Sequence, residues 1–183
     1  MLEIPEDRSE RQKLSRAIND AFKVGDFEGL GRVFGGAPRW FDEKMPFELG
    51  LGHPLEHAIY WSPVAFIIAL LNAGSNPNYA DPAGFPSIIA ALSTERPDRL
   101  DLIRTLLSHG ADPDMRGVND WTPLHHAVSR RDAEAIGLLL HSGADPSLRT
   151  RIDDYGTALE GAERSGFEAG ASLLREAMKN RHA

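Results

Sequence analysis

Residues 121 to 147 read WTPLHHAVSRRDAEAIGLLLHSGADPS, and the two ends of this stretch carry motifs that occur three times in the chain. In the first motif, a proline precedes an apolar residue, and an alanine follows that apolar residue three positions later. The second motif is a four-residue turn that begins with glycine and ends with proline. The earlier copies pair HPLEHA at 53–58 with GSNP at 74–77, and FPSIIAA at 85–91 with GADP at 110–113.

Equivalent positions in these copies lie at a constant distance. Leu55 and Ile88 are 33 residues apart, and so are Gly110 and Gly143. Self-similarity at this period is typical of a solenoid of stacked helical hairpins, in which each unit buries its apolar face against its neighbours only. Such chains usually bind partners and rarely catalyse reactions.

The stretch 121–147 resembles an ankyrin repeat, because it keeps the family's T-P-L-H, its central leucine run and its G-A-D. With looser units included, the resemblance runs from about Leu14 to about Lys179. It implies an all-α fold, an ankyrin-type solenoid of stacked helix-turn-helix repeats with protruding finger loops. It does not identify a partner, since the same scaffold serves unrelated functions.

We expect a single ankyrin repeat domain over residues 1–183. Its predicted parts are an N-terminal cap unit at 14–37, an irregular insertion at 35–52, central repeats at 53–82, 83–116 and 117–149, and a C-terminal cap unit at 150–179. The repeat at 83–116 has three extra residues between its motifs. Pro97 cannot lie inside a helix, so we place these residues in the turn between the two helices of that repeat.

Local signals mark several helix starts. Ser9 to Lys23 has apolar residues at helical spacing, and Asp26 can cap a second short helix. Pro54 suits the first turn of another helix, and Ser62-Pro63 reads as an N-cap serine followed by a first-turn proline.

The insertion at 35–52 departs from the repeat pattern. It carries five large apolar residues among prolines and glycines: Trp40, Phe41, Met45, Phe47 and Leu49. Exposing all five would be costly, so we expect them to fold as a lid over the first unit. The alternative is a binding element, because long ordered loops are often functional.

Composition excludes several classes of function. The formal charge of −7 and the pI near 5.5 argue against binding to nucleic acid or to an anionic membrane. The absence of cysteine excludes disulfides and thiolate chemistry and suits a reducing compartment. The N-terminal dozen residues do not read as a secretory signal, and the longest apolar run is too short to cross a bilayer. We expect a cytoplasmic monomer without a cofactor.

One segment matches an enzyme motif. His53-Pro54-Leu55-Glu56-His57 spells H-x-x-E-H, a pattern of zinc peptidases. The repeat register already explains these residue types, and no clear third ligand follows. We therefore expect no metal and no catalytic residues, and a metal-dependent enzyme built on this segment is the alternative of another class.

The resemblance implies roles for two polar residues of the best repeat. His125 is the T-P-L-H histidine, which implies a hydrogen bond to the backbone of the neighbouring finger. Thr122 is implied to cap its helix, and both roles are structural.

The resemblance also implies a binding face, namely the concave face made of finger tips and of the exposed side of each first helix. Aromatic and arginine residues on one face are typical of binding hot spots. The candidate partner-binding residues are Trp61, Phe85, Arg116, Asn119, Trp121, Arg130, Arg149, Asp154 and Tyr155. For Phe85 and Trp121 the alternative is packing of finger on finger.

We expect a non-catalytic module that binds a folded protein partner through this face. The alternative within the binding class is an inhibitor or immunity protein that blocks a toxic enzyme. A small acidic domain suits a basic nuclease as its target.

Overall fold

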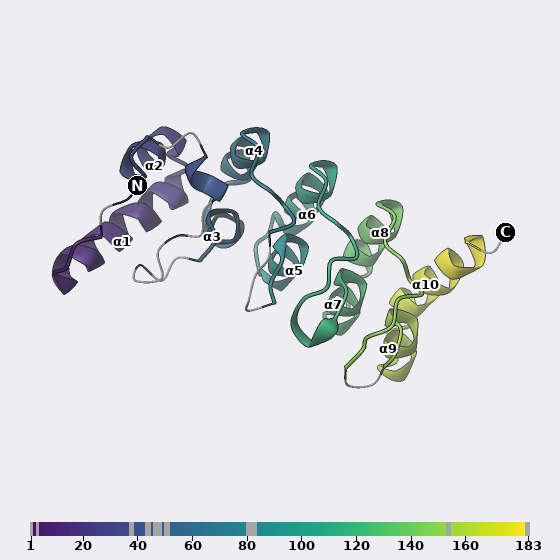
Figure 1. The fold of residues 1–183 in the computed structure, drawn as a ribbon. Helices are drawn as coiled ribbons and strands as arrows, with labels where there is room; N and C mark the ends of the chain where they lie inside the picture. The colour runs from purple at the N-terminus through teal and green to yellow at the C-terminus, as the bar shows by residue number, and fades with distance from the viewer. Residues whose placement is uncertain are drawn as a thin grey trace. The chain divides into compact units, whose positions relative to one another are not determined.

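The computed structural model describes residues 2, 4–36, 39–42, 45, 49, 52–79, 84–152 and 155–181. Within these residues the secondary structure is helical, apart from one isolated bridge between Arg149 and Thr157 (Figure 1). This confirms the all-α prediction. The chain divides into two compact units, Met1–Pro77 and Asn78–Ala183.

Over its described residues, the first unit contains four α-helices and the short 3-10 helix η1 (Trp40–Asp42). The α-helices are α1 (Arg8–Val24), α2 (Phe27–Val33), α3 (Pro54–Trp61) and α4 (Val64–Asn72). Asp26 caps α2 as predicted, since its Oδ1 accepts the N–H of Gly29 at 2.8 Å. The prediction for Ser62 is wrong. Helix α4 begins at Val64 with Pro63 at its N-cap, and Ser62 is the C-cap of α3.

The core of the first unit includes an aromatic cluster, and the 35–52 insertion contributes to this core. Trp40, Phe41, Met45 and Leu49 are all buried. The Trp40 ring stacks on Phe34 with ring centroids 5.2 Å apart. The lid prediction is therefore confirmed for these four residues, and Phe47 lies outside the described residues.

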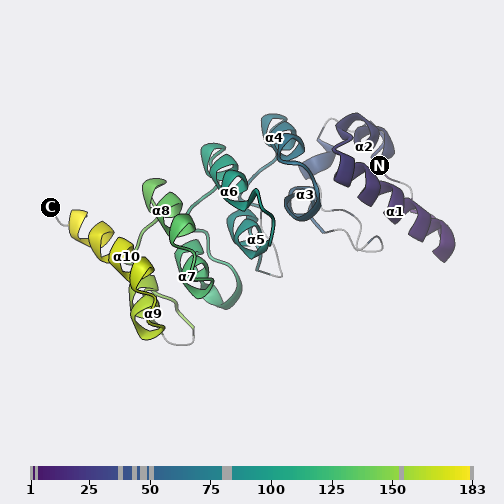
Figure 2. The same cartoon turned by 180° about the vertical axis from the view of Figure 1, so that it is seen from behind.

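In the second unit, the described residues form three pairs of α-helices. They are α5 (Ser87–Ser93) with α6 (Arg99–Ser108), α7 (Pro123–Ser129) with α8 (Ala133–His141), and α9 (Ala158–Arg164) with α10 (Glu168–Asn180). A 3-10 turn, η3 (Val118–Asp120), precedes α7. Helices α5, α7 and α9 form one row and α6, α8 and α10 a second row, as both views show (Figures 1 and 2). We call α5, α7 and α9 the first helices.

Leucine and isoleucine residues of both rows form the core of the second unit. Leu124 and Ile88, equivalent in the repeat, are 0% and 2% exposed. Leu159, the third equivalent position in this unit, is only half-buried. The extra residues of the 83–116 repeat lie between α5 and α6, in the turn that contains Pro97, as predicted.

Side-chain contacts within the second unit repeat at the period of the sequence. The Nδ2 of Asn78 donates to the O of Gly110 at 2.8 Å, 32 positions away. The Oδ1 of Asp114 accepts the N–H of Asp145 at 2.9 Å, 31 positions away. Each repeat therefore satisfies backbone groups of the next, and this fixes the register of the stack.

Candidate functional site

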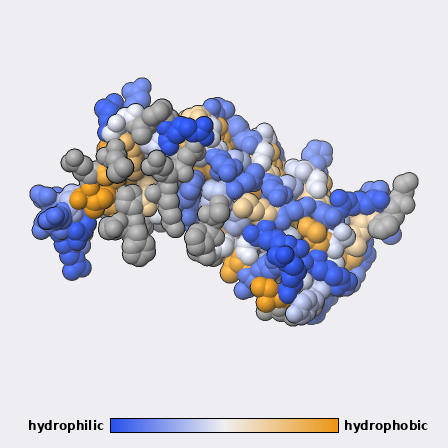
Figure 3. Space-filling view, viewed as in Figure 1, coloured by the Kyte–Doolittle hydropathy of each residue, from blue (hydrophilic) through white to orange (hydrophobic). Residues whose placement is uncertain are grey.

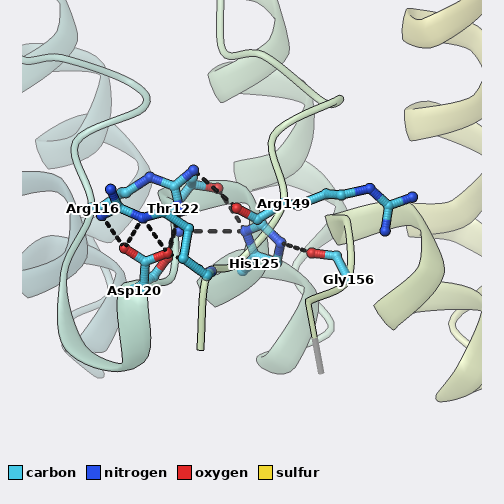
Figure 4. Close-up of polar contacts among 7 residues, drawn as sticks. Arg116, Asp120, Thr122, His125, Arg149 and Gly156 are labelled. Carbon is cyan, nitrogen blue, oxygen red and sulfur yellow. Dashed lines mark hydrogen bonds and ion pairs between the residues drawn. The ribbon is translucent and has the colours of Figure 1, made fainter. Parts of the chain in front are cut away.

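A buried carboxylate joins two consecutive finger loops of the second unit. We call residues 114–121 the α7 finger and residues 147–157 the α9 finger, after the helices that they precede. The side chain of Asp120, in the α7 finger, is 7% exposed. Its Oδ2 accepts a hydrogen bond from Arg116 Nη1 at 2.7 Å and from the backbone N–H of Arg151 at 2.7 Å (Figure 4). The guanidinium of Arg151 also donates to Oδ1 at 2.5 Å.

The hydrogen bond from the Arg151 side chain is the main reason why the pKa of Asp120 falls to about 2, in spite of burial, which acts in the opposite direction. The carboxylate is therefore ionised at neutral pH, with two arginines around it. Because one arginine comes from each finger, Asp120 ties the α7 finger to the α9 finger.

The two predicted arginines at the finger bases hold backbone groups. Arg116 Nη2 donates to the O of Arg149 at 2.9 Å. Arg149 Nη1 donates to the O of Tyr155 at 2.9 Å, and its Nη2 pairs with Glu160 Oε1 at 2.8 Å. These contacts brace the α9 finger. Contact of either arginine with a partner stays a prediction.

His125 links the start of α7 to the α9 finger. Its Nδ1 accepts the backbone N–H of Thr122 at 3.3 Å and lies 2.8 Å from the Thr122 hydroxyl (Figure 4). Because Nδ1 acts as an acceptor, the ring proton is on Nε2, which donates to the O of Gly156 at 3.1 Å. Thr122 is the N-cap of α7 in a capping box. Both predicted structural roles are confirmed.

The neighbouring His126 has a different environment. Both of its ring nitrogens are buried and have no hydrogen-bond partner among the described residues. Its ring meets that of Trp121 edge to face, with centroids 5.7 Å apart. Burial, and then the charge of Arg130, lower the pKa of His126. Trp121 is half-buried and packs on its own first helix.

The α9 finger presents two large apolar side chains to solvent. Tyr155 is 63% exposed and Ile152 is 53% exposed. Tyr155 has a φ of +51°, a left-handed backbone conformation that disfavours a bulky residue. The hydrogen bond from Arg149 to the Tyr155 carbonyl holds this conformation in place. The polar network therefore holds an exposed aromatic ring on a fixed backbone.

The remaining predicted contact residues are placed differently. Asn119 is exposed with a φ of +57°, which asparagine tolerates better than most residues. Phe85 is half-buried. Arg130 Nη2 donates to Glu95 Oε1 at 2.5 Å. Trp61 is 58% exposed and belongs to the first unit. Asp154 lies outside the described residues.

Sequence reasoning missed Asp120, Arg151 and Ile152. Asp120 and Arg151 are 31 residues apart, close to the repeat period, and that spacing was the signal available for their pairing. No periodicity in the sequence marks Ile152, because it lies in an enlarged finger without a counterpart in the other repeats.

The H-x-x-E-H segment surrounds the start of α3. His53 is the N-cap of that helix, and its Nδ1 accepts the N–H of Leu55 at 3.3 Å. His57 packs edge to face on Phe22 at 4.8 Å. Burial, and then the nearby charge of Lys23, lower the pKa of His57 to about 4. In the part of the chain that the structure describes, no three His, Cys, Asp or Glu residues are grouped to hold a metal ion.

Across the described residues, no helix has the length and apolar character needed to cross a membrane.

Comparison with known proteins places this architecture in a family. The family model described as "Ankyrin repeats (many copies)" matches residues 96–140. The human "SH3 and multiple ankyrin repeat domains protein 1" is 35% identical over 151 residues, which is 78% of this chain. The "Ankyrin repeat protein nuc-2" of Neurospora crassa is 35% identical over 102 residues, or 55% of the chain. The "Glycerophosphocholine phosphodiesterase gde1" of Schizosaccharomyces pombe is 34% identical over 108 residues, or 58% of the chain.

The chain thus carries ankyrin repeats and has the all-α repeat fold that goes with them, which supports a protein-interaction module in general terms. It spans only a small part of these relatives: 7% of the human protein and 9% of each fungal protein. One of the three is an enzyme by name, and the similarity covers less than a tenth of its length.

Proposed function

We propose that the second unit binds a folded protein partner, without catalysis, through the first helices α5, α7 and α9 and the fingers that precede α7 and α9. The observation that carries this proposal is the exposure of Tyr155 and Ile152 on one braced finger. Four large apolar side chains are strongly exposed in the described residues, and two of them lie within four residues of each other here.

The bracing matters for affinity. Binding costs free energy when loops and side chains must be ordered, and a preorganised surface reduces that cost. The α9 finger is held by Asp120 through Arg151, by Arg149 through the Tyr155 carbonyl, and by His125 through the Gly156 carbonyl. A partner that contacts Tyr155 therefore meets a backbone that needs little rearrangement.

The composition of the surface also suits a protein partner. Tyrosine and arginine are enriched among residues whose truncation weakens protein complexes most. The Arg151 side chain is 74% exposed and lies two residues after Arg149, whose side chain is 58% exposed. Both guanidinium groups are fixed by carboxylates and still have exposed surface beside the apolar groups.

We also propose that the chain is a monomer and works in a reducing compartment such as the cytoplasm. It binds neither nucleic acid nor membrane in this proposal. A chain without cysteine is suited to such a compartment. A formal charge of −7 repels polyanions and anionic lipid surfaces as a whole.

A capture experiment tests the proposal. The wild-type chain and a Trp121→Ala, Tyr155→Ala double variant are immobilised in equal amounts, and the proteins retained from source lysate are compared by quantitative mass spectrometry. The matched control is an Arg104→Ala, Glu134→Ala double variant, which changes exposed residues of α6 and α8. We expect a protein that wild type and control retain equally and that the first variant loses. Equal retention by all three would contradict the proposed surface.

A further inference from the structure

A groove of about 950 Å³ is lined by residues of the first unit. One wall is a single stripe of α1, and the other includes His57 and Trp61 of α3 together with Leu49. The stripe residues recur every three or four positions from Arg8 to Lys23, which places them on one face of the helix. The hydroxyl of Ser15 donates to the O of Leu49 at 3.1 Å and joins α1 to Leu49 in the lining of the groove.

The groove is basic although the chain is acidic. Among the described residues that line it, four have cationic side chains (Arg8, Arg11, Arg16 and Lys23) and one has a carboxylate, Asp20. The Asp20 carboxylate lies 3.8 Å from the Lys23 ammonium, and both side chains are more than half exposed. Within the described part of the chain, no carboxylate pairs with Arg8 or Arg16. The outer end of α1 is strongly hydrophilic in the space-filling view (Figure 3). Concentrated positive charge on a chain of formal charge −7 indicates a local anionic ligand.

The length of the groove suits a short extended peptide. From Arg8 to Lys23 the helix rises by about 22 Å, at about 1.5 Å per residue. An extended peptide covers that distance with about seven residues, at about 3.3 Å each. Arg11 is already oriented, because its Nη1 donates to the carbonyl oxygens of Pro5 at 3.1 Å and Glu6 at 2.6 Å.

The Lys23 end of the groove has an aromatic wall. His57 packs on Phe22, the neighbour of Lys23, and Trp61 follows His57 by four residues on the same face of α3. The Trp61 side chain is 58% exposed. An occupant can therefore place an apolar group on Trp61 while its carboxylates follow the cations of α1.

We propose that this groove binds an acidic peptide segment of about seven residues, extended along α1, with an apolar side chain at the end that contacts Trp61. The groove belongs to the first unit and shares no residue with the surface proposed for the second unit. Nucleic acid fits less well, because a long polyanion extends beyond the groove and meets the net negative charge of the rest of the chain.

Binding is measured by fluorescence anisotropy with a fluorescein-labelled peptide of seven glutamates followed by one phenylalanine. The intact chain is compared with an Arg8→Gln, Arg16→Gln, Lys23→Gln variant. The control variant, Lys13→Gln, Arg32→Gln, Arg104→Gln, has the same net charge and changes only exposed residues outside the groove. We expect the groove variant to lose at least tenfold in affinity and the control to stay within about twofold of wild type. Affinity should also fall as salt rises.

Two further measurements separate the occupants. Trp61→Ala should weaken the phenylalanine-bearing peptide severalfold and leave a peptide of seven glutamates alone unchanged. A labelled single-stranded oligothymidylate with seven phosphates should bind at least tenfold more weakly than the peptide. Undetectable peptide binding at millimolar concentration, an equal loss in both triple variants, or tighter binding of the oligonucleotide would each overturn the proposal. Thermal melts that match wild type show that the variants are folded.

Discussion

The carboxylate of Asp120 accepts hydrogen bonds from both the backbone N–H of Arg151, at 2.7 Å, and the guanidinium of the same residue, at 2.5 Å, so one side chain holds the next finger at Arg151. The two residues belong to consecutive repeats. Replacing the carboxylate should therefore affect the α9 finger, which lies beyond the repeat that carries the substitution.

Asp120→Asn should lower the free energy of unfolding by about 1.5–3 kcal/mol at pH 7, the net value of hydrogen bonds to a charged group. Asparagine also tolerates the positive φ of this position, so the change tests the charge and not the backbone. Chemical denaturation measures the loss. Asp101→Asn, in an exposed pair with Arg104, is the control and should change stability little.

The pH dependence of this substitution has a definite sign. The pKa of Asp120 is about 2 in the folded chain, below its ordinary value of 3.8. Its contribution to stability is therefore complete above about pH 4 and is lost as pH falls towards 2. The difference between wild type and Asp120→Asn should shrink over that window. A difference that is constant from pH 7 to pH 2 would exclude the ionised carboxylate as the cause.

Replacement by phenylalanine should lower the free energy of unfolding at His125 but not at the adjacent His126. His125→Phe removes the acceptor for Thr122 and the donor to Gly156, which should cost about 1–3 kcal/mol. His126→Phe removes two buried nitrogens without partners in the described part of the chain and keeps the edge contact with Trp121. Its unfolding free energy should equal or exceed that of wild type. Urea titrations of both variants test the assignment, which fails if His126→Phe is the more destabilising of the two.

The first unit should lose stability below neutral pH because of His57. Its pKa is about 4 in the folded state, below the ordinary histidine value of 6.5, so the unfolded chain takes up the proton first. The stabilisation is fully present above about pH 6.5 and falls by roughly 2 kcal/mol as pH drops towards 4, after allowance for partial solvent screening.

His57→Phe keeps an aromatic ring against Phe22 and removes the titrating group. Melting temperatures of the variant should therefore change less between pH 7 and pH 4.5 than those of wild type. Parallel curves for the two proteins would contradict the role given to His57.

Leu124 and Leu159 occupy equivalent positions of the repeat but differ in how deeply they are buried. Leu124 is 0% exposed, so Leu124→Ala should cost about 2–5 kcal/mol. Leu159 is half-buried in the last repeat, so Leu159→Ala should cost clearly less. Denaturant midpoints of the two variants measure the difference. Equal losses would mean that the last repeat packs as tightly as the central one.

The repeat period predicted the fold because each repeat encodes its own helices and its own contact with the next. Leu124, Thr122 and His125 could be assigned from one fully matching motif, and the structure confirms their burial or hydrogen bonds. The lid at Trp40 could be predicted because exposing so many apolar groups is costly.

The candidate site was harder to predict from the sequence. Arg116 and Arg149 were predicted as contact residues because arginine is common in binding sites. What each one contacts depends on the residues around it in the fold, and both donate hydrogen bonds to backbone carbonyls of the α9 finger. The exposure of Ile152 and the basic groove of α1 depend on which faces remain uncovered after packing. Periodicity marks the buried face of a helix and leaves its exposed face unassigned.

The central claim is that the second unit binds a protein through the α9 finger and the first helices, and the affinity of single variants for the captured partner tests it most directly. Tyr155→Ala should weaken binding by about 2 kcal/mol, roughly 30-fold, while the free energy of unfolding changes by about 0.5 kcal/mol or less. Glu134→Ala, on the exposed side of α8, should bind like wild type. Wild-type affinity for Tyr155→Ala, together with a large loss for Glu134→Ala, would contradict the account and move the binding surface to the second row of helices.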